Sequence, residues 1–398
     1  MLNRSSVKQY IGNANNVFIC LIMLLALLTR LYYIYAYPSV RLSHDEIGYH
    51  RMAMQFLHKG FLGYYSEKPD AFVTPGYPLF LAAVYWMAAF FNAPPLITIR
   101  VVQVIISVGS VFLVYLIAEK SGLPRVGIIA AIISAVYLPS FMANNRVLTE
   151  VVFTSLLLGY ILSLITAFEK LRIGWHILAG VIMAVAVLVR PTVIIFFPVP
   201  YLVQFTICKN FRYLTGLMIA TAALCLVMTP WWVRNYLVFD KFIVFATQSG
   251  NPLLRGADPY DPYDRKGPSI IKNVPEDQMT LVAVKRIKKG LKDNPRLWIK
   301  WFTIGKLSFL WLKPWGVYGT GARTLHFGVI VIMGWAGTLT NLFDPRMRWP
   351  ALVIIVLTVV QLAFIPIERY IYPLTPLMAV MASTLLAKIA QRHLTLRV

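Results

Sequence analysis

The chain contains 398 residues, 58% of them hydrophobic, and its mean hydropathy is +0.66. This composition excludes an ordinary soluble domain and predicts an all-α polytopic membrane protein, a single domain over residues 1–398 with no separate soluble domain. The net charge of +22 does not indicate a nucleic-acid partner, because Lys and Arg lie in short clusters between apolar runs, where membrane lipids are the expected partner. Cys20, Cys208 and Cys225 have no metal-ligand spacing and support neither a disulfide framework nor a zinc site.

Ten apolar runs are long enough to cross a bilayer as helices. They lie near residues 17–37, 100–118, 125–142, 149–168, 174–189, 191–207, 213–230, 324–343, 349–366 and 370–387. The first run is too long for the apolar region of a signal peptide and lacks a small-residue cleavage site, so we interpret it as a retained span.

An eleventh apolar run, residues 76–91, decides the topology. If it does not cross, most Lys and Arg of the short loops share one side, and only Arg146, Arg190 and Arg369 occupy short loops opposite. If it does cross, every later loop changes side and the N-terminal charges oppose the rest. The charge rule therefore predicts ten spans in the cell membrane, with both termini cytoplasmic and residues 76–91 along the outer interface.

Two external loops are long, residues 38–99 and 231–323. In the second, a polar stretch from Gln248 to Gly267 carries Asp-Pro and Gly signals that argue against regular structure. A basic, loosely amphipathic helix over residues 281–292 follows. Its predicted apolar face comprises Ala283, Val284, Ile287 and Leu291, and its basic face comprises Lys285, Arg286 and Lys289. This helix is either an interfacial anchor on anionic headgroups or a docking site for an anionic acceptor or carrier lipid.

The first external loop opens with adjacent carboxylates, in the segment His44-Asp45-Glu46-Ile47-Gly48-Tyr49-His50. Asp45 and Glu46 point in different directions on any regular backbone, so one can face a substrate while the other binds a metal, a tyrosine or an arginine. The alternative is a helix-capping pair at the start of an interfacial helix from Glu46 toward Lys59. His44 and His50 lack clear metal-ligand spacing.

Ten spans bring a set of ionisable side chains to one outer face: His44, Asp45, Glu46, Arg100, Glu150, Arg234, Glu368 and Arg369. Arginine at a span end either contacts headgroups or binds phosphate oxygens in a bidentate manner. Glu150 either pairs with Arg146 at i,i+4 or faces the same cavity as Asp45, as a second cation ligand or an orienting group for a sugar hydroxyl. Asp45 and Glu150 are thus the candidate ligands of a divalent cation, Mg or Mn, and the sequence indicates no other cofactor.

Several motifs together resemble the GT-C superfamily of membrane glycosyltransferases, specifically bacterial enzymes related to protein O-mannosyltransferases and lipid A aminoarabinose transferases. The motifs are His44-Asp45-Glu46 with Tyr49; Thr74-Pro75-Gly76-Tyr77-Pro78-Leu79-Phe80; Arg100; Arg146 to Glu150; Arg190-Pro191; Pro230-Trp231-Trp232-Val233-Arg234-Asn235-Tyr236; and Glu368-Arg369-Tyr370 with Pro373 and Pro376. Each is weak alone, but their order and spacing run nearly end to end.

The resemblance implies a GT-C fold, with interfacial helices in the two external loops. It also implies an inverting transfer of one hexosyl or pentosyl unit from a polyprenyl-phosphate donor. The acceptor hydroxyl would belong to a lipid, a glycan or a protein on the non-cytoplasmic side of the bacterial inner membrane.

Residue roles follow from the same resemblance. Asp45 would be the catalytic base and Glu46 its structural partner. Arg100 matches an arginine that contacts the donor phosphate or the active-site carboxylates. Lys68 resembles a phosphate-binding lysine, although its spacing to the Pro-Gly-Tyr-Pro segment is longer here. The further candidates for donor or substrate binding are His44, Glu150, Arg234, Arg369 and Tyr370.

Two alternatives stay open. A polymerase or ligase that moves a lipid-linked oligosaccharide would use a similar external cavity with a wider acceptor groove. A lipid or glycan transporter would place ionisable groups along a permeation path. Against transport, the ionisable groups gather at one interface, and no two halves of the chain mirror each other.

Overall fold

A computed structural model describes residues 4–39, 41–248, 250–259, 269–272, 274–316 and 319–395. Over these residues the chain is helical and contains no strand. The α-helices of the first half are α1 (Arg4–Ala36), α2 (Asp45–Lys59), α3 (Gly76–Phe90), α4 (Pro95–Glu119), α5 (Val126–Val136), α6 (Leu138–Asn145), α7 (Glu150–Lys170), α8 (Ile173–Val189), α9 (Val199–Cys208) and α10 (Arg212–Phe239).

The second half continues with α11 (Gly250–Gly256), α12 (Met279–Asp293), α13 (Pro295–Lys300), α14 (Lys306–Trp311), α15 (Thr320–Leu325), α16 (Gly334–Asn341), α17 (Arg348–Gln361) and α18 (Thr375–Thr395). Four short 3-10 helices are η1 (Pro191–Phe196), η2 (Glu276–Gln278), η5 (Glu368–Tyr370) and η6 (Tyr372–Leu374). Two π-helical turns, η3 (Trp301–Gly305) and η4 (His326–Met333), lie inside longer helical runs.

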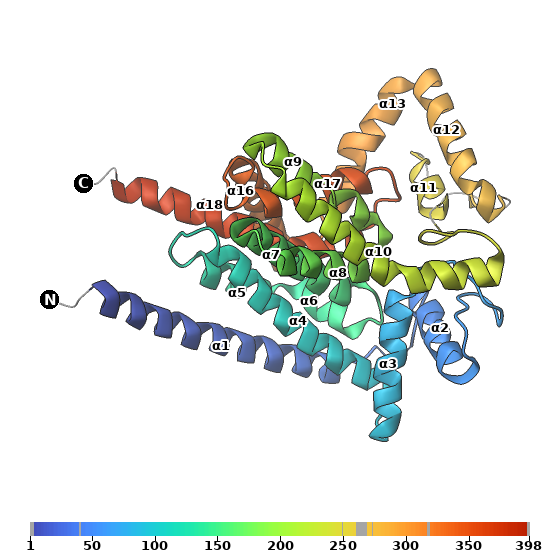
Figure 1. The fold of residues 1–398 in the computed structure, drawn as a ribbon, viewed down its shortest axis with the longest axis horizontal. Coiled ribbons are helices and arrows are strands. Elements are labelled where there is room, and N and C mark those ends of the chain that lie inside the picture. The colour runs from blue at the N-terminus through green and yellow to red at the C-terminus, as the bar shows by residue number, and fades with distance from the viewer. Residues whose placement is uncertain are drawn as a thin grey trace.

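The long helices lie side by side along the longest axis of the molecule (Figure 1). α8 packs between α7 and α10, and α4 packs against α1, α5 and α7. The helices approach closely where glycine faces a neighbour: a Cβ at Gly180 of α8 would lie 2.2 Å from the carbonyl oxygen of Ala220 in α10. Such small-residue contacts are typical of helix packing in membranes.

Seven helical runs of the described chain are long and apolar enough to cross a membrane, or eight if the pair α5 and α6, bent by 53°, is one span. Three shorter apolar helices, α3, α8 and α17, accompany them. The polytopic all-α membrane class is confirmed. The number of ten spans stays a prediction.

One end of the bundle carries both the start of α1 and the end of α18 (Figure 1), as an even number of crossings requires. The basic loops predicted to share a side meet there. Lys120 at the end of α4 pairs with Glu169 at the end of α7, and Arg346 donates to the carbonyl oxygen of Ser121 at 3.2 Å. Which compartment this end faces stays a prediction.

The opposite end carries α2 and α3, and α11, α12 and α13 lie beside it (Figure 1). α2 has nearly the bounds predicted for the first interfacial helix, and it ends at Gly60, whose φ of 74° closes the helix in the left-handed conformation. α3 stands across the long helices in Figure 1, which is the orientation expected of a helix along the interface.

The prediction of irregular structure from Gln248 to Gly267 is wrong at α11. Leu254 of this helix and the adjacent Ala257 are fully buried against α12 and α13. Apolar burial therefore stabilises a short helix despite the turn-forming residues around it. Residues 260–268 lie outside the described part of the chain.

The helix predicted over residues 281–292 is present as α12, but its predicted apolar face is wrong in part. Ala283 is buried in a small core with Met279 and Trp298, whereas Val284 and Leu291 are exposed. Relative to the predicted orientation, the helix is turned about its axis so that Ala283 and Gly290 face α11 and α13.

Candidate active site

A cavity of about 570 Å³ opens at the end of the bundle that carries α2 and α3. One part of its wall is polar, formed by the start of α2, the start of α7, the end of α8 and η5. The polar lining side chains include Asp45, Thr149, Glu150, Arg190, Arg369 and Tyr370. The rest of the wall is mostly apolar, with lining residues that include Ile194, Ile195, Val244, Leu357, Val360 and Phe364.

Asp45 enters this cavity from the first turn of α2. His44 turns the chain into the helix with a φ of 48°, a conformation that costs energy for a residue other than glycine. The N-terminus of a helix favours carboxylates through its exposed N–H groups and dipole. One oxygen of Asp45 pairs with the Arg369 guanidinium, and the other accepts a hydrogen bond from the Tyr64 hydroxyl at 3.3 Å.

Glu46 points the other way, into the protein, and is 1% exposed. Its carboxylate accepts hydrogen bonds from the Ser43 N–H and hydroxyl at 3.0 Å, the Val147 N–H at 2.8 Å and the Arg146 guanidinium at 3.2 Å. The capping alternative thus describes Glu46, since backbone N–H groups fill its oxygens, but it does not describe Asp45. Glu46 joins the start of α2 to the segment before α7.

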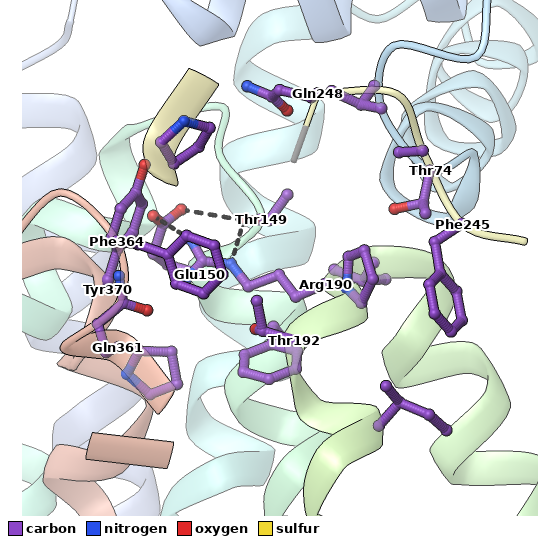
Figure 2. Close-up of a pocket in the computed structure, with 18 of the residues that line it drawn as sticks. Thr74, Thr149, Glu150, Arg190, Thr192, Phe245, Gln248, Gln361, Phe364 and Tyr370 are labelled. Atoms are coloured by element: carbon purple, nitrogen blue, oxygen red, sulfur yellow. Dashed lines mark hydrogen bonds and ion pairs between the residues drawn. The ribbon is translucent and has the colours of Figure 1, made fainter. Parts of the chain in front are cut away.

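Glu150, the first residue of α7, is 1% exposed at the cavity wall and pairs with Arg190 at the end of α8. Arg190 also donates from Nε to the Thr149 hydroxyl at 2.7 Å. Figure 2 shows this arrangement, with Arg190 extended toward Glu150 and Thr149. The predicted pairing of Glu150 with Arg146 is wrong, because Arg146 precedes α7 and bonds to Glu46 instead.

Arg369 connects the two cavity carboxylates. It pairs with Asp45 through Nη2, and its Nε lies 3.9 Å from Glu150. The Tyr370 ring lies between the two arginines, 5.3 Å from the guanidinium carbon of Arg369 and 5.6 Å from that of Arg190. Two arginines and two carboxylates, drawn from α2, α7, α8 and η5, therefore form one charge-balanced cluster.

Five predicted residues are absent from the cavity lining: His44, the buried Glu46, Lys68, Arg100 and Arg234. Arg100, on α4, is buried and donates to the carbonyl oxygen of Ser39. Arg234 donates to the carbonyl oxygen of Asp70 at 2.9 Å and thereby ties the first external loop to α10. Lys68 is exposed on that loop. His44, also predicted, acts through its backbone, and its exposed side chain is not part of the lining.

Tyr64 is a site residue that the sequence interpretation missed. Its ring packs on Gly48, where a Cβ would lie 2.3 Å from the ring, so the glycine is required for the tyrosine to reach Asp45. Burial and the neighbouring Asp45 raise the pKa of Tyr64 well above its usual value, which keeps the phenol as a hydrogen-bond donor. A lone tyrosine after a Gly-containing loop carries no sequence signal, since only the folded loop brings it to α2.

The two candidate metal ligands do not fit a divalent cation in this arrangement. Asp45 and Glu150 are each paired with an arginine. Among the described residues, no group of three or more His, Cys, Asp or Glu side chains is placed to hold a metal ion. Guanidinium groups therefore supply the positive charge that a cation would bring to these carboxylates.

The chain is similar to known proteins in part of its sequence and in its fold. Residues 73–233 match the family model described as dolichyl-phosphate-mannose-protein mannosyltransferase. No curated protein matches the chain. The archaeal oligosaccharyltransferase AglB from Archaeoglobus fulgidus, solved with an inhibitory peptide and a dolichol-phosphate, has a TM-score of 0.58 and 14% identity over 96% of this chain.

ArnT from Cupriavidus metallidurans, solved with undecaprenyl phosphate, has a TM-score of 0.57 and 13% identity over 94% of this chain. The matches cover 51% of AglB and 60% of ArnT, so this chain corresponds to little more than half of each. The chain has the fold of the GT-C membrane glycosyltransferases. With the family-model match, this confirms the resemblance predicted from the sequence.

Proposed function

We propose that the chain is an inverting glycosyltransferase that moves a single sugar from a polyprenyl-phosphate donor to an acceptor hydroxyl. The observation that carries the proposal is the composition of the cavity, which combines two arginines and a partly exposed carboxylate with an apolar wall. A donor with an anionic headgroup and an isoprenoid tail needs both surfaces. The two similar structures were solved with dolichol-phosphate and undecaprenyl phosphate, donor-type lipids of this chemistry.

Asp45 is the group best suited to act as the general base. Its carboxylate is 31% exposed and faces the cavity, whereas Glu150 is buried against Arg190. In the proposed reaction Asp45 takes the proton of the acceptor hydroxyl while that oxygen forms a bond to the anomeric carbon. The bond from the anomeric carbon to the phosphate oxygen breaks on the opposite face, so the configuration inverts, and the electron pair leaves with polyprenyl phosphate.

Arg190 and Arg369 would stabilise the leaving phosphate, since charge develops on its oxygens in the transition state. Without donor, Arg369 is bound to Asp45 and occupies a lone pair that the base needs. An arriving phosphate attracts the same guanidinium. Donor binding would thus weaken the Asp45–Arg369 pair and free the carboxylate for the acceptor proton.

The side of the membrane is part of the proposal. The cavity lies at the end of the bundle opposite the clustered basic loops. Because basic loops are retained in the cytoplasm, this separation supports a non-cytoplasmic active site. The acceptor there would be a lipid, a glycan or a protein.

The direct test is sugar transfer or release from a panel of radiolabelled polyprenyl-phosphate sugars by the full chain in lipid nanodiscs. We expect turnover of at least one donor, and loss of that turnover in Asp45→Asn. Glu67→Gln is the matched control, because Glu67 is an exposed carboxylate paired with Lys59 on the same external loop. A parallel sample with chelator should keep its activity, since the site carboxylates are already paired with arginines.

Other outcomes would contradict the proposal. Turnover only of lipid-linked oligosaccharides would replace single-sugar transfer with block transfer. Full activity of Asp45→Asn would overturn its role as base. If no donor of either kind reacts in a sample with an intact melting transition, the assignment to glycosyl transfer fails. Transport of a lipid or glycan is then the hypothesis to test.

A further inference from the structure

The segment formed by α12 and α13, residues 279–300, is called here the basic arm. It extends past the side of the helix bundle at the end that carries the cavity (Figure 1). Its inner side packs on α11 in a small core of Leu254, Ala257, Met279, Ala283 and Trp298. Gly290 is necessary for this packing, because a Cβ there would lie 1.9 Å from the Trp298 ring. The arm is thus an ordered element with one covered side.

The outer side of α12 carries four lysines, Lys285, Lys288, Lys289 and Lys292, and all four are exposed. Their spacings of three, four and seven residues bring them to one face of the helix. None of them pairs with a carboxylate among the described residues, whereas Arg286, on the inner side, pairs with Asp258 at 3.4 Å. The outer lysines therefore have their charge available for a partner.

Exposed apolar side chains also occur on the basic arm, with Leu281 and Leu291 on α12 and Ile299 on α13. Leu281 is 55% exposed and lies one turn before Lys285. A helix that shows lysine and leucine together on one outer face fits the boundary between phospholipid headgroups and acyl chains. The adjacent bundle is itself membrane-embedded, so such a boundary lies within reach of the arm.

We propose that the basic arm binds the headgroups of anionic phospholipids in the membrane leaflet beside the cavity. The phosphates meet Lys285, Lys288, Lys289 and Lys292, and the exposed apolar side chains enter the upper acyl region. A membrane fits these observations better than a polyanionic macromolecule, because the outer face is both basic and apolar.

The arm is connected to the cavity wall by hydrogen bonds. Arg286 of the arm donates to the carbonyl oxygen of Ala257, and Trp301, the residue that directly follows the arm, donates to that of Gly256, both at 2.9 Å. On the other side of α11, the Ile365 N–H donates to the carbonyl oxygen of Pro252 at 2.9 Å. Pro252 is part of the cavity lining. The arm is therefore connected through α11 to a residue of the cavity lining.

The experiment places an environment-sensitive fluorophore at Ile299→Cys in a full-length chain whose Cys20, Cys208 and Cys225 are replaced by Ser. The protein is studied in nanodiscs of phosphatidylcholine alone and with increasing phosphatidylglycerol. We expect a blue shift that depends on phosphatidylglycerol and weakens at high salt, because screening shortens the range of the lysine charges. Since both leaflets of a nanodisc have the same composition, the result does not depend on which way the protein faces.

The test variant replaces the four outer lysines by Gln, and the matched control replaces them by Arg. Each lysine near an anionic surface strengthens the attraction roughly fivefold. The Gln variant should therefore need at least about tenfold more phosphatidylglycerol for the same shift, and the Arg variant should behave as the parent. An equal shift in phosphatidylcholine alone, or an unchanged response of the Gln variant, would overturn the proposal. This readout needs no enzymatic activity, so it fails or succeeds independently of the proposed function.

Discussion

Asp45 and Glu46 are neighbours in the chain, yet they lie in two different environments. Glu46 is enclosed by Ser43, Arg146 and the backbone of Val147, and backbone N–H groups fill both of its oxygens. Asp45 is held by two side chains, Arg369 and Tyr64, at the edge of a cavity. Each carboxylate pairs with an arginine, but Glu46 is enclosed in the protein interior whereas Asp45 stays accessible from the cavity.

The difference teaches that the donors around a carboxylate decide what it can do. Backbone N–H groups are fixed by the fold, so Glu46 cannot exchange them for a substrate without local unfolding. Side chains such as Arg369 can turn toward an incoming anion. A carboxylate that is to take part in chemistry therefore needs movable partners and access to a cavity, and Asp45 has both.

The largest expected effect is on turnover in Asp45→Asn. The amide keeps the shape and one acceptor oxygen but cannot take a proton at neutral pH. Turnover should fall roughly 10²- to 10⁴-fold, while the melting temperature in detergent falls less than in Glu46→Gln, because Asp45 is partly exposed and Arg369 keeps Glu150 nearby. Near-normal turnover in the assay that identifies the donor would remove Asp45 from the role of base.

Glu46→Gln should show the reverse pattern. The Ser43 and Val147 N–H groups donate to different oxygens of Glu46, so the NH₂ group that replaces one oxygen faces one of these donors and leaves it without its acceptor. We expect a loss of about 1–3 kcal/mol in the free energy of unfolding, seen as a lower melting temperature. Activity per folded molecule should be kept. An unchanged melting temperature together with lost turnover would mean that Glu46, too, takes part in the reaction.

Lys306→Met tests whether Lys306 stabilises residues 362–364, the segment that leads to Arg369. Lys306 is fully buried, and its Nζ lies within hydrogen-bond distance of the carbonyl oxygens of Leu362, Ala363 and Phe364, at 2.7, 3.4 and 3.0 Å. Methionine leaves these oxygens without a donor. We expect a lower melting temperature and weaker donor binding, since Phe364 lines the cavity. A variant with normal stability and normal donor KM would contradict this role.

The pH dependence of stability provides a second measurement at the same residue. Burial lowers the pKa of Lys306 to about 7, while an unfolded chain keeps it at about 10.4. Between these values the unfolded state binds more protons, so the free energy of unfolding contributed by Lys306 rises with pH. The parent protein should gain stability relative to Lys306→Met from about pH 7 to about pH 10. A difference that does not change with pH would show that the lysine has its ordinary pKa in the folded state.

The smallest expected effect is that of Tyr64→Phe. This change removes one hydrogen bond of 3.3 Å to Asp45 and leaves the ring packed on Gly48. A bond of this kind contributes about 0.5–1.5 kcal/mol, so turnover should change by roughly two- to tenfold with an unchanged donor KM. Tyr65→Phe is the control, since Tyr65 is 60% exposed and lies outside the cavity lining. An equal effect of both changes would mean that the loop, rather than the bond, matters.

Much of the site could be predicted because its residues carry strong local signals. The sequence has a carboxylate pair directly after the first span and arginines at the ends of later spans. Charged side chains near a bilayer cost free energy, so their presence indicates a functional role. Their common location followed from counting spans and loop charges. Asp45, Glu150 and Arg369 do meet at one cavity. Arg100 and Arg234 carry the same signal and lie outside the cavity lining, because a span end fixes the depth of a residue in the membrane and not the direction of its side chain. Lys68, which the family resemblance alone indicates, also lies outside the lining.

The sequence by itself determined the membrane class, the first interfacial helix and the end of the bundle where the ionisable groups gather. These properties depend on hydrophobic length, helical periodicity and loop charge, which are all local along the chain. Only the tertiary structure decided that Arg146 binds Glu46, that Arg190 binds Glu150 and that Tyr64 reaches Asp45. Those partners are far apart in sequence, so their contacts depend on helix rotation and loop packing, which no local pattern encodes.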